Sequence, residues 1–279
     1  MRATNTGQPL LQARGIAKCY VQKRAFSGEK FHVRAFEDVS LSVHRGTTLA
    51  IVGESGAGKS SLARCLALLE TPDRGEILLE GGDATKLRGS ALAATRHKVQ
   101  LIFQDPTTAL NPRFSAAEVV SEPLIIRGTM GRAECRERAI ELIRLAGLPV
   151  ESAEKTSLEF SGGQRQRLTI ARALTLEPSL LILDEALSSL DLANQQMILD
   201  LLAVLQARLS LAYIHVSHDL RLVARVADEV AVMLEGRIVE QNRTAELFAR
   251  PEHPYTKQLL EAMPTLEKIL AKRLHGEVA

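Results

Sequence analysis

The group of residues best suited to chemistry is a glycine-rich loop, GESGAGKSS, at residues 53–61. Its spacing fits G-x-x-x-x-G-K-[ST], the pattern of a phosphate-binding loop, because glycines let successive backbone N–H groups approach phosphate oxygens closely. We expect Lys59 to reach the β- and γ-phosphates of a nucleotide and the Ser60 hydroxyl to ligate Mg²⁺. A glycine-rich turn that binds nothing is the alternative. The predicted nucleotide-binding residues are Gly53, Glu54, Ser55, Gly56, Ala57, Gly58, Lys59, Ser60 and Ser61.

A pair of carboxylates follows an apolar stretch, LLILDE, at residues 180–185. A strand tip beside a phosphate loop is the place for an aspartate that organises Mg²⁺, and we assign this role to Asp184. Glu185 would then polarise the attacking water as a general base. Strand ends often carry charge without a catalytic role, so the pair is informative only because it lies downstream of the phosphate loop.

A second stretch rich in glycine and serine, EFSGGQRQR, occupies residues 159–167 and contains no lysine. Ser161 offers a hydroxyl, Gly162 and Gly163 expose backbone N–H groups, and a helix RQRLTIARALTL is predicted to begin directly afterwards. These features predict an anion site that lacks a lysine. The alternative is a glycine-rich helix cap.

The elements that must position these residues alternate between strands and helices, which predicts a mostly parallel α/β sheet. Compact apolar runs such as TLAIVG are typical of buried parallel strands, whereas SSLARCLALLE and LDLANQQMILDLLAVLQARL have helical spacing. Two strand-like segments before residue 44 flank a predicted hairpin turn at Ser27-Gly28. Between Asn111 and about Lys155 the strand signals disappear, and MGRAECRERAIELIRLAGL predicts a long amphipathic helix.

The predicted organisation has three parts. A nucleotide-binding core with an antiparallel β subdomain covers residues 1–104 and 164–242, and a helical subdomain that ends in the second glycine stretch covers residues 105–163. A helical tail covers residues 243–279.

Composition argues against several classes of protein. The 279 residues carry a net charge of +2, no tryptophan and 4% aromatic residues, so we expect no nucleic-acid partner. No apolar run approaches the roughly 18 residues that span a bilayer, and the first residues lack a signal-peptide apolar region. Three widely spaced cysteines, Cys19, Cys65 and Cys135, form no metal-ligand pattern. We therefore expect a cytoplasmic chain whose membrane role, if any, comes through a partner.

The order of five motifs, GESGAGKSS, IFQDP, EFSGGQRQR, LLILDEALSSLD and HVSHD, closely resembles that of ABC-type ATPase subunits over roughly residues 10–262. The resemblance implies a P-loop NTPase fold of the RecA-like kind, with a mostly parallel sheet core, an antiparallel β subdomain and an inserted α-helical subdomain. It also implies ATP and Mg²⁺ as ligands.

The resemblance gives roles to further residues. Tyr20 matches the aromatic that stacks on adenine, Gln104 the glutamine that touches Mg²⁺ and the attacking water, and His218 the histidine that contacts the γ-phosphate. Taken singly, each has a structural alternative. Asp191 matches the loop that communicates between two nucleotide sites, with helix capping as the bland alternative. Ser161 to Gln164 matches the family signature, which faces the γ-phosphate held by the opposite subunit.

The implied mechanism is a two-subunit ATP sandwich. Each site would take Ser161, Gly162, Gly163 and Gln164 from one chain, and from the other chain Lys59, Ser60, Gln104, Asp184, Glu185 and His218. Within the second set the catalytic residues are Glu185, His218 and Gln104, and the metal ligands are Ser60, Gln104 and Asp184. ATP closes the pair, and hydrolysis reopens it.

Four positions depart from the usual family pattern. Phe160 stands where leucine is usual, Ala186-Leu187 where Pro-Thr is frequent, and Ser189 where alanine is common. None of these changes removes a catalytic group, so hydrolysis is expected to survive.

Three segments resemble the ATPases of peptide and nickel importers: the insertion after Tyr20, QDPTTALNPRFSAAEVVSEPL and the tail PEHPYTKQLLEAMP. That group implies a second ATPase subunit (identical or a sister chain), two transmembrane permease subunits, an extracytoplasmic binding protein, and a peripheral position on the cytoplasmic face of the membrane. Asn111 to Glu122 is the expected contact surface for the permease. DEALSSLDL and SHDLRLV lean towards the nickel-type or antimicrobial-peptide-type subunit. Because no cysteine follows Cys135, we predict no iron–sulfur cluster in the tail.

Two alternatives stay open at this point: an ABC-type ATPase that acts on DNA or the ribosome, and a non-catalytic nucleotide-binding regulator. The first class usually has a long coiled-coil insertion or two ATPase halves, and this chain has a short insertion and one set of motifs. The second conflicts with a full catalytic set. The transported substrate is not identified by these residues.

Overall fold

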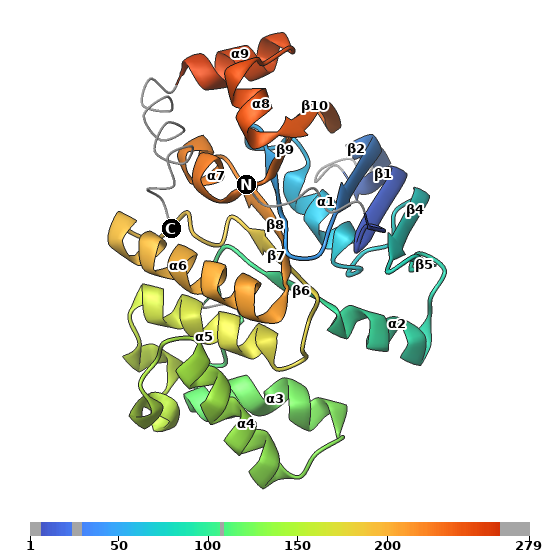
Figure 1. Cartoon of the computed structure of the whole chain (residues 1–279). Coiled ribbons are helices and arrows are strands. Elements are labelled where there is room, and N and C mark those ends of the chain that lie inside the picture. The colour runs from blue at the N-terminus through green and yellow to red at the C-terminus, as the bar shows by residue number, and fades with distance from the viewer. Residues whose placement is uncertain (1–6, 24–29, 107–108, 263–279) are drawn as a thin grey trace. The chain divides into compact units, whose positions relative to one another are not determined.

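The computed structural model describes residues 7–23, 30–106 and 109–262 (Figure 1). The chain forms two compact units, one drawn from residues 1–96 and 212–279 and the other from residues 97–211. Parts of three predicted features fall outside the described residues. They are the turn at Ser27-Gly28, positions 107 and 108 of the segment QDPTTALNPRFSAAEVVSEPL, and the tail beyond residue 262.

An antiparallel sheet in the strand order β2-β1-β4-β5 belongs to the first unit. Its strands are β1 (Leu11–Lys23), β2 (Lys30–Val43), β4 (Arg74–Leu79) and β5 (Gly82–Asp83). β1 pairs with β2 on one edge and with β4 on the other, and its register with β2 shifts between Ala13 and Cys19. Buried Phe36 and Val39 on β2 face the core, so this sheet has one packed face.

Four further strands of the first unit run in the order β10-β9-β3-β8. β3 (Thr48–Val52) pairs in parallel with both β8 (Ala212–Ser217) and β9 (Glu229–Leu234), and all of its residues are buried. This agrees with the prediction of a buried parallel strand. The segment DEVAVMLEGRIVE, residues 228–240, forms a hairpin of β9 and β10 (Arg237–Arg243), joined at Glu235-Gly236, where both residues have positive φ.

Short helices complete the first unit: α1 (Lys59–Leu66), α2 (Gly89–His97), α7 (Leu220–Val226), α8 (Thr244–Ala249) and α9 (Pro254–Glu261). α1 starts within the glycine-rich stretch, at Lys59, and α8 and α9 lie in the segment predicted as a helical tail. Leu247 of α8 and Tyr255 of α9 belong to one buried apolar cluster with residues of β3, α7 and β9.

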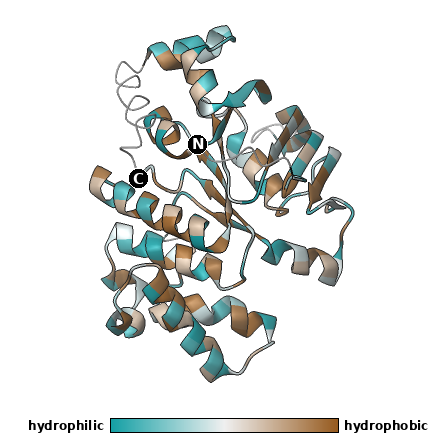
Figure 2. Ribbon diagram, viewed as in Figure 1, coloured by the Kyte–Doolittle hydropathy of each residue, from teal (hydrophilic) through white to brown (hydrophobic). Residues whose placement is uncertain are grey.

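The second unit contains two parallel strands, β6 (Val99–Ile102) and β7 (Leu180–Asp184). Its helices are α3 (Ala116–Arg127), α4 (Arg132–Leu145), α5 (Gly162–Leu174) and α6 (Leu192–Leu209), with 3-10 turns at Val150–Glu154 and Ser157–Glu159. α3, α4 and α5 are in mutual contact, and Val120, Ile143 and Ile170 on them are fully buried. Figure 2 shows hydrophobic and hydrophilic residues alternating along α6, as in a helix with one apolar face.

The division into core, helical subdomain and tail stays a prediction, because the two compact units reflect packing and not function. Within the described part of the chain, none of the helices combines the length and the apolar character that crossing a bilayer would require.

Candidate functional site

The glycine loop adopts a backbone that other residues would strain. Gly53, Gly56 and Gly58 have φ angles of +153°, +85° and +96°. A Cβ on Gly53 would lie 2.1 Å from the carbonyl oxygen of Met233, and one on Gly58 would lie 2.1 Å from that of Ala35. The turn at residues 54–56 is exposed. Close-packed glycines at both ends and an exposed turn between them form a backbone cradle that suits phosphate oxygens.

Lys59 lies inside this loop. The residue is 4% exposed, and its Nζ donates to the carbonyl oxygens of Gly53 at 2.8 Å and Glu54 at 2.7 Å. Carbonyl groups offer an ammonium only partial negative charges, so a phosphate oxygen is a stronger partner for it. The position of Lys59 fits its predicted role as a phosphate ligand.

α1 directs its N-terminus at the same loop. Gly58 precedes the helix and has no side chain to cap it, so an anion can take the place of the capping group. Ser60 and Ser61 stand in the first turn of this helix. From the outer side, Gly236 N donates to the carbonyl oxygen of Ala57 at 3.1 Å and fixes the loop. The loop and the helix together suit a di- or triphosphate.

His218 follows β8 at the sheet edge where the loop follows β3. Val52 pairs with Ser217, so Gly53 and His218 leave the sheet at the same level. His218 is exposed, whereas His215 is buried within β8, and burial lowers the pKa of His215 to about 4. Of the two histidines, His218 is placed to meet a ligand.

Tyr20 is partly buried on β1, and its hydroxyl donates to Glu70 Oε2 at 2.5 Å. The other oxygen of this carboxylate accepts from Arg64 Nε at 2.9 Å, and Arg64 belongs to α1. Lys18 Nζ lies 5.8 Å from the centre of the Tyr20 ring. The ring is thereby tethered to the helix that follows the loop, which suits the predicted contact with adenine.

In the second unit, two of the three predicted catalytic residues, Gln104 and Glu185, follow the ends of the two parallel strands. Ile102 pairs with Leu183, so Gln104 after β6 and Asp184 and Glu185 at the end of β7 share one sheet edge. Asp184 is buried, and Glu185 has a φ of +50°, an uncommon conformation for a residue with a side chain.

Ser188, which the motifs did not single out, joins these groups. Gln104 Nε2 donates to Ser188 Oγ at 3.4 Å, and Ser188 Oγ donates to the carbonyl oxygen of Glu185 at 2.8 Å. One hydroxyl therefore connects the strand-end glutamine to the backbone of the carboxylate pair. The contact spans 84 residues of sequence, so only the pairing of β6 with β7 brings it about.

The stretch from Ser161 to Gln164 forms a reciprocal helix cap. Ser161 Oγ accepts from Gln164 N at 3.3 Å, and Gln164 Oε1 accepts from Ser161 N at 2.9 Å. The predicted helix start at Arg165 is wrong: α5 begins at Gly162, because this cap extends the helix back over both glycines. Accepting a hydrogen bond leaves the Ser161 hydroxyl its proton, so a helix cap and an anion site are compatible here.

Asp191 caps α6, as the helix-capping alternative predicted. Its Oδ1 accepts from Asn194 N at 2.9 Å and its Oδ2 from Asn194 Nδ2 at 2.7 Å, and these bonds lower the pKa of the carboxyl group. A Cβ on Gly163 would lie 2.3 Å from Asn194 Oδ1, so a larger residue here would displace the Asn194 side chain. The signature stretch and the Asp191 loop are therefore neighbours within the second unit.

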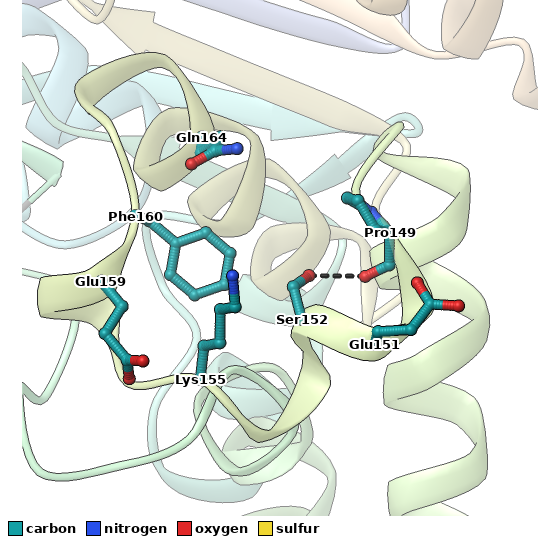
Figure 3. Close-up of a pocket in the computed structure, with 7 residues that line it drawn as sticks. All are labelled: Pro149, Glu151, Ser152, Lys155, Glu159, Phe160 and Gln164. Carbon is teal, nitrogen blue, oxygen red and sulfur yellow. Dashed lines mark hydrogen bonds between the residues drawn. The ribbon is translucent and has the colours of Figure 1, made fainter.

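Phe160, one of the departures from the family pattern, points inward. It is 3% exposed, and it lines a cavity of about 110 Å³ (Figure 3) together with Pro149, Glu151, Ser152, Lys155, Glu159 and Gln164. Ser152 Oγ donates to the carbonyl oxygen of Pro149 at 2.5 Å and closes the turn on one wall. Phenylalanine in place of leucine thus alters the packing beneath the signature stretch.

The other departures divide between the interior and the surface. Ala186 and Leu187 are buried, and Ser189 is exposed. Like Phe160, the first two act on packing, and none of the three takes the place of a catalytic group.

Phe160→Ala should lower the free energy of unfolding by about 3–5 kcal/mol, because a buried aromatic ring is lost beside an existing cavity. Phe160→Leu should cost less than about 1.5 kcal/mol, because most of the apolar volume is kept. Urea denaturation measures both values. Phe103→Ala is the matched control, since Phe103 is 40% exposed in the same unit and should lose less. Equal losses for Phe103→Ala and Phe160→Ala would contradict the packing role.

The described structure gathers the predicted residues in two sets. Within the first unit, the glycine loop and His218 share one sheet edge, and Tyr20 is tied to α1. Within the second unit, Gln104, Asp184 and Glu185 share another edge, and the signature stretch lies against the Asp191 loop. Four residues that contact these groups carry no motif signal in the sequence: Glu70, Ser188, Asn194 and Tyr255.

Comparison with known proteins identifies the family. The family profile described as ABC transporter matches residues 36–188, and that described as oligopeptide/dipeptide transporter, C-terminal region, matches residues 239–279. The dipeptide transport ATP-binding protein DppF of Haemophilus influenzae is 41% identical over 273 residues, which cover 97% of this chain and 84% of the relative. DppF of Escherichia coli is 44% identical over 260 residues, which cover 93% of this chain and 78% of the relative.

Solved structures agree with the predicted fold class. A dimeric ATP-binding cassette in a post-hydrolysis state, bound to ADP and Pi, superimposes with a TM-score of 0.73 at 29% identity, covering 84% of this chain and 98% of the other. cbiO1 of Clostridium perfringens, part of an ABC transporter complex, gives a TM-score of 0.75 at 26% identity, covering 95% and 100%. The α/β P-loop fold is confirmed, and the named relatives favour transport over action on nucleic acid or the ribosome. The chain therefore belongs to the ABC transporter family, as an ATPase subunit of the branch that carries the oligopeptide/dipeptide transporter C-terminal region.

Proposed function

We propose that this ATPase powers the import of short peptides through a membrane permease. The observation that carries the proposal is the match of residues 239–279 to the oligopeptide/dipeptide transporter C-terminal region, next to a glycine loop and a signature stretch in one chain. Relatives named as dipeptide transport proteins support the peptide as cargo. The nickel-type features of the sequence make a metal chelate the second candidate.

In this proposal the first unit holds the nucleotide. Tyr20 stacks on adenine, the N–H groups of residues 53–61 bind the phosphates, and Lys59 exchanges its carbonyl partners for phosphate oxygens. His218 contacts the γ-phosphate. The exposed turn and the glycine contacts of the loop support these roles.

The second unit supplies the catalytic carboxylates. Glu185 orients the attacking water and accepts its proton, and Gln104 contacts the same water. Ser60, Gln104 and Asp184 would hold Mg²⁺, which when bound neutralises charge on the β- and γ-phosphates. The shared strand edge of Gln104 with Asp184 and Glu185, and the Ser188 link, support the grouping of these three residues within the second unit.

A second ATPase subunit completes each site. Ser161 to Gln164 bind the γ-phosphate of the nucleotide that the partner holds, through the hydroxyl of Ser161 and the N-terminus of α5. Asp191, next to this stretch, communicates between the two sites. The dimeric cassette bound to ADP and Pi among the structural relatives supports this arrangement.

Two permease subunits and an extracytoplasmic binding protein complete the transporter, with this chain on the cytoplasmic face of the membrane. Asn111 to Glu122 would receive the permease. In the described residues, this region holds the cap of α3, where Ser115 Oγ accepts from Glu118 N at 3.2 Å and Glu118 Oε2 accepts from Ser115 N at 2.7 Å. Such a reciprocal cap gives the contact surface a fixed end.

Uptake measurements in cells that lack the gene test the proposal. Accumulation of a radiolabelled dipeptide should fall on deletion and return with the wild-type gene, but not with a Lys59→Ala gene. Accumulation of ⁶³Ni²⁺ in the same cells is the matched measurement for the second candidate. Dipeptide uptake that is unchanged by deletion, with nickel uptake lost, would replace the peptide by a metal chelate.

A further inference from the structure

The last helix of the described residues, α9, contacts the glycine loop directly. Glu54 N donates to the hydroxyl oxygen of Tyr255 at 3.0 Å, across 201 residues of sequence. The Tyr255 ring is 8% exposed and packs in the apolar cluster that contains Val52, the last residue of β3. The ring is therefore fixed by burial, and its hydroxyl reaches the base of the loop.

The Gly53–Glu54 peptide group lies between Tyr255 and Lys59. Its N–H donates to Tyr255 Oη, and its carbonyl oxygen accepts from Lys59 Nζ at 2.8 Å. The N–H and C=O of a trans peptide point in opposite directions, so the two side chains hold the plane from opposite sides. The hydrogen bond that the N–H donates also polarises the carbonyl group of the same peptide, which strengthens the hydrogen bond that this carbonyl accepts from Lys59.

The start of α9 is built to hold Tyr255 in place. Glu240 on β10 accepts from Glu252 N and His253 N, at 2.9 Å each. His253 then caps α9, with Nδ1 accepting from Tyr255 N at 3.2 Å. Pro254 occupies the first position of the helix, where its fixed φ favours helix initiation. Three strands therefore help to fix Tyr255. β10 does so through Glu240, β9 through its pairing with β10, and β3 through the apolar cluster.

We propose that Tyr255 is a positioning residue for nucleotide binding, which sets the Gly53–Glu54 peptide and through it Lys59. This gives the C-terminal region of the chain a role in ATP binding. The inference rests on the proposed role of the glycine loop, but the two are tested by different variants. Loss of turnover in a Lys59 variant supports the role of the loop, and this result does not depend on the role of Tyr255.

Tyr255→Phe is the central test, because it removes only the hydroxyl and keeps the buried ring. The dissociation constant for ADP, measured by isothermal titration with the full chain, should rise about 3- to 10-fold, as expected for the loss of one partly buried hydrogen bond. The backbone amide of Glu54 should exchange faster with solvent, while the amides of β3 do not. A role limited to general stability would change exchange in β3 as well.

Two further variants sharpen the result. Tyr213→Phe removes a hydroxyl from another buried tyrosine in the same unit, and Tyr213 pairs with Thr48 at the end of β3 remote from the loop. Its ADP affinity should stay within about twofold of wild type. Glu240→Gln keeps an acceptor for only one of the two amides, so it should weaken ADP binding in the same direction by a smaller factor.

Wild-type ADP affinity and wild-type exchange at Glu54 in Tyr255→Phe would overturn the proposal. Equal losses of affinity in Tyr255→Phe and Tyr213→Phe would overturn it too, because they would trace the effect to core packing. Thermal unfolding of each variant verifies that the compared proteins are folded at the temperature of the titration.

Discussion

Lys59→Ala is expected to reduce ATP turnover by at least about 10²- to 10³-fold, the usual effect of removing one group that stabilises charge in a transition state. The ammonium is enclosed by the loop, where a residue 4% exposed interacts with charge through little water. Its two carbonyl partners are the loop's own backbone, so removing it also loosens the cradle. ATP turnover by the purified transporter, or by the purified chain where it is active alone, is the measurement.

Two controls isolate the charge of Lys59. Lys59→Met keeps a long apolar stem in the loop and should be as inactive as Lys59→Ala, since only the ammonium differs. Lys86→Ala removes a lysine whose side chain is 84% exposed in the same unit, and turnover should be unchanged. Full turnover by a folded Lys59→Met protein would mean that the glycine loop has been misassigned.

Glu185→Gln is expected to reduce turnover by about 10²- to 10⁴-fold and to leave ATP affinity near wild type, because an amide cannot take the proton of the attacking water. The substitution keeps the size of the side chain, so the φ of +50° at this position should be kept. Two quantities are measured and compared: the turnover at saturating ATP and the dissociation constant for ATP. A loss of affinity that matched the loss of turnover would contradict a role confined to catalysis.

Glu177→Gln is a closely matched control for that experiment. Glu177 has a φ of +52°, lies in the same unit, and carries a carboxylate whose side chain is 76% exposed. Since both positions have left-handed backbone, a general effect of glutamine in that conformation would appear in both variants. We expect turnover to fall only in Glu185→Gln.

Motifs whose parts are adjacent in sequence were the easiest to predict. The glycine loop depends on the backbone of nine neighbouring residues, so the residue types alone predict the turn that the structure shows. Asp191 and Ser161 act on N–H groups three residues away, and both caps were among the considered interpretations. Even there, the start of α5 was misplaced, because the reciprocal bond of Gln164 lengthens the helix backwards.

Contacts that need tertiary folding could not be predicted. Glu54 and Tyr255 are 201 residues apart, and nothing local to Tyr255 marks it as a partner of the loop. Ser188 meets Gln104 only because β6 and β7 pair in parallel. The turn between β9 and β10 has only two residues, Glu235-Gly236, so the strand pattern continues almost unbroken across it and hides the reversal of the chain.

Phe160 shows how the structure changes the meaning of a motif departure. A departure from the family pattern next to the signature stretch is easily taken for a contact with the partner subunit. Because Phe160 is 3% exposed, its effect on a partner is indirect, through the shape of the segment from Glu159 to Gln164, which also lines the pocket. Tyr255 extends the same lesson, since a residue far from every nucleotide motif in the sequence touches the nucleotide loop in the fold.

ATP is expected to join two ATPase subunits, and light scattering of Glu185→Gln protein measures this association. With ATP present, the 30.5 kDa chain should double in mass, or should form a one-to-one complex with a sister ATPase that carries the equivalent change. Without ATP, or with Lys59→Ala added to Glu185→Gln, it should remain a monomer. If the chain binds ATP and still keeps the mass of one subunit, both alone and with the sister ATPase, ATP does not join two subunits.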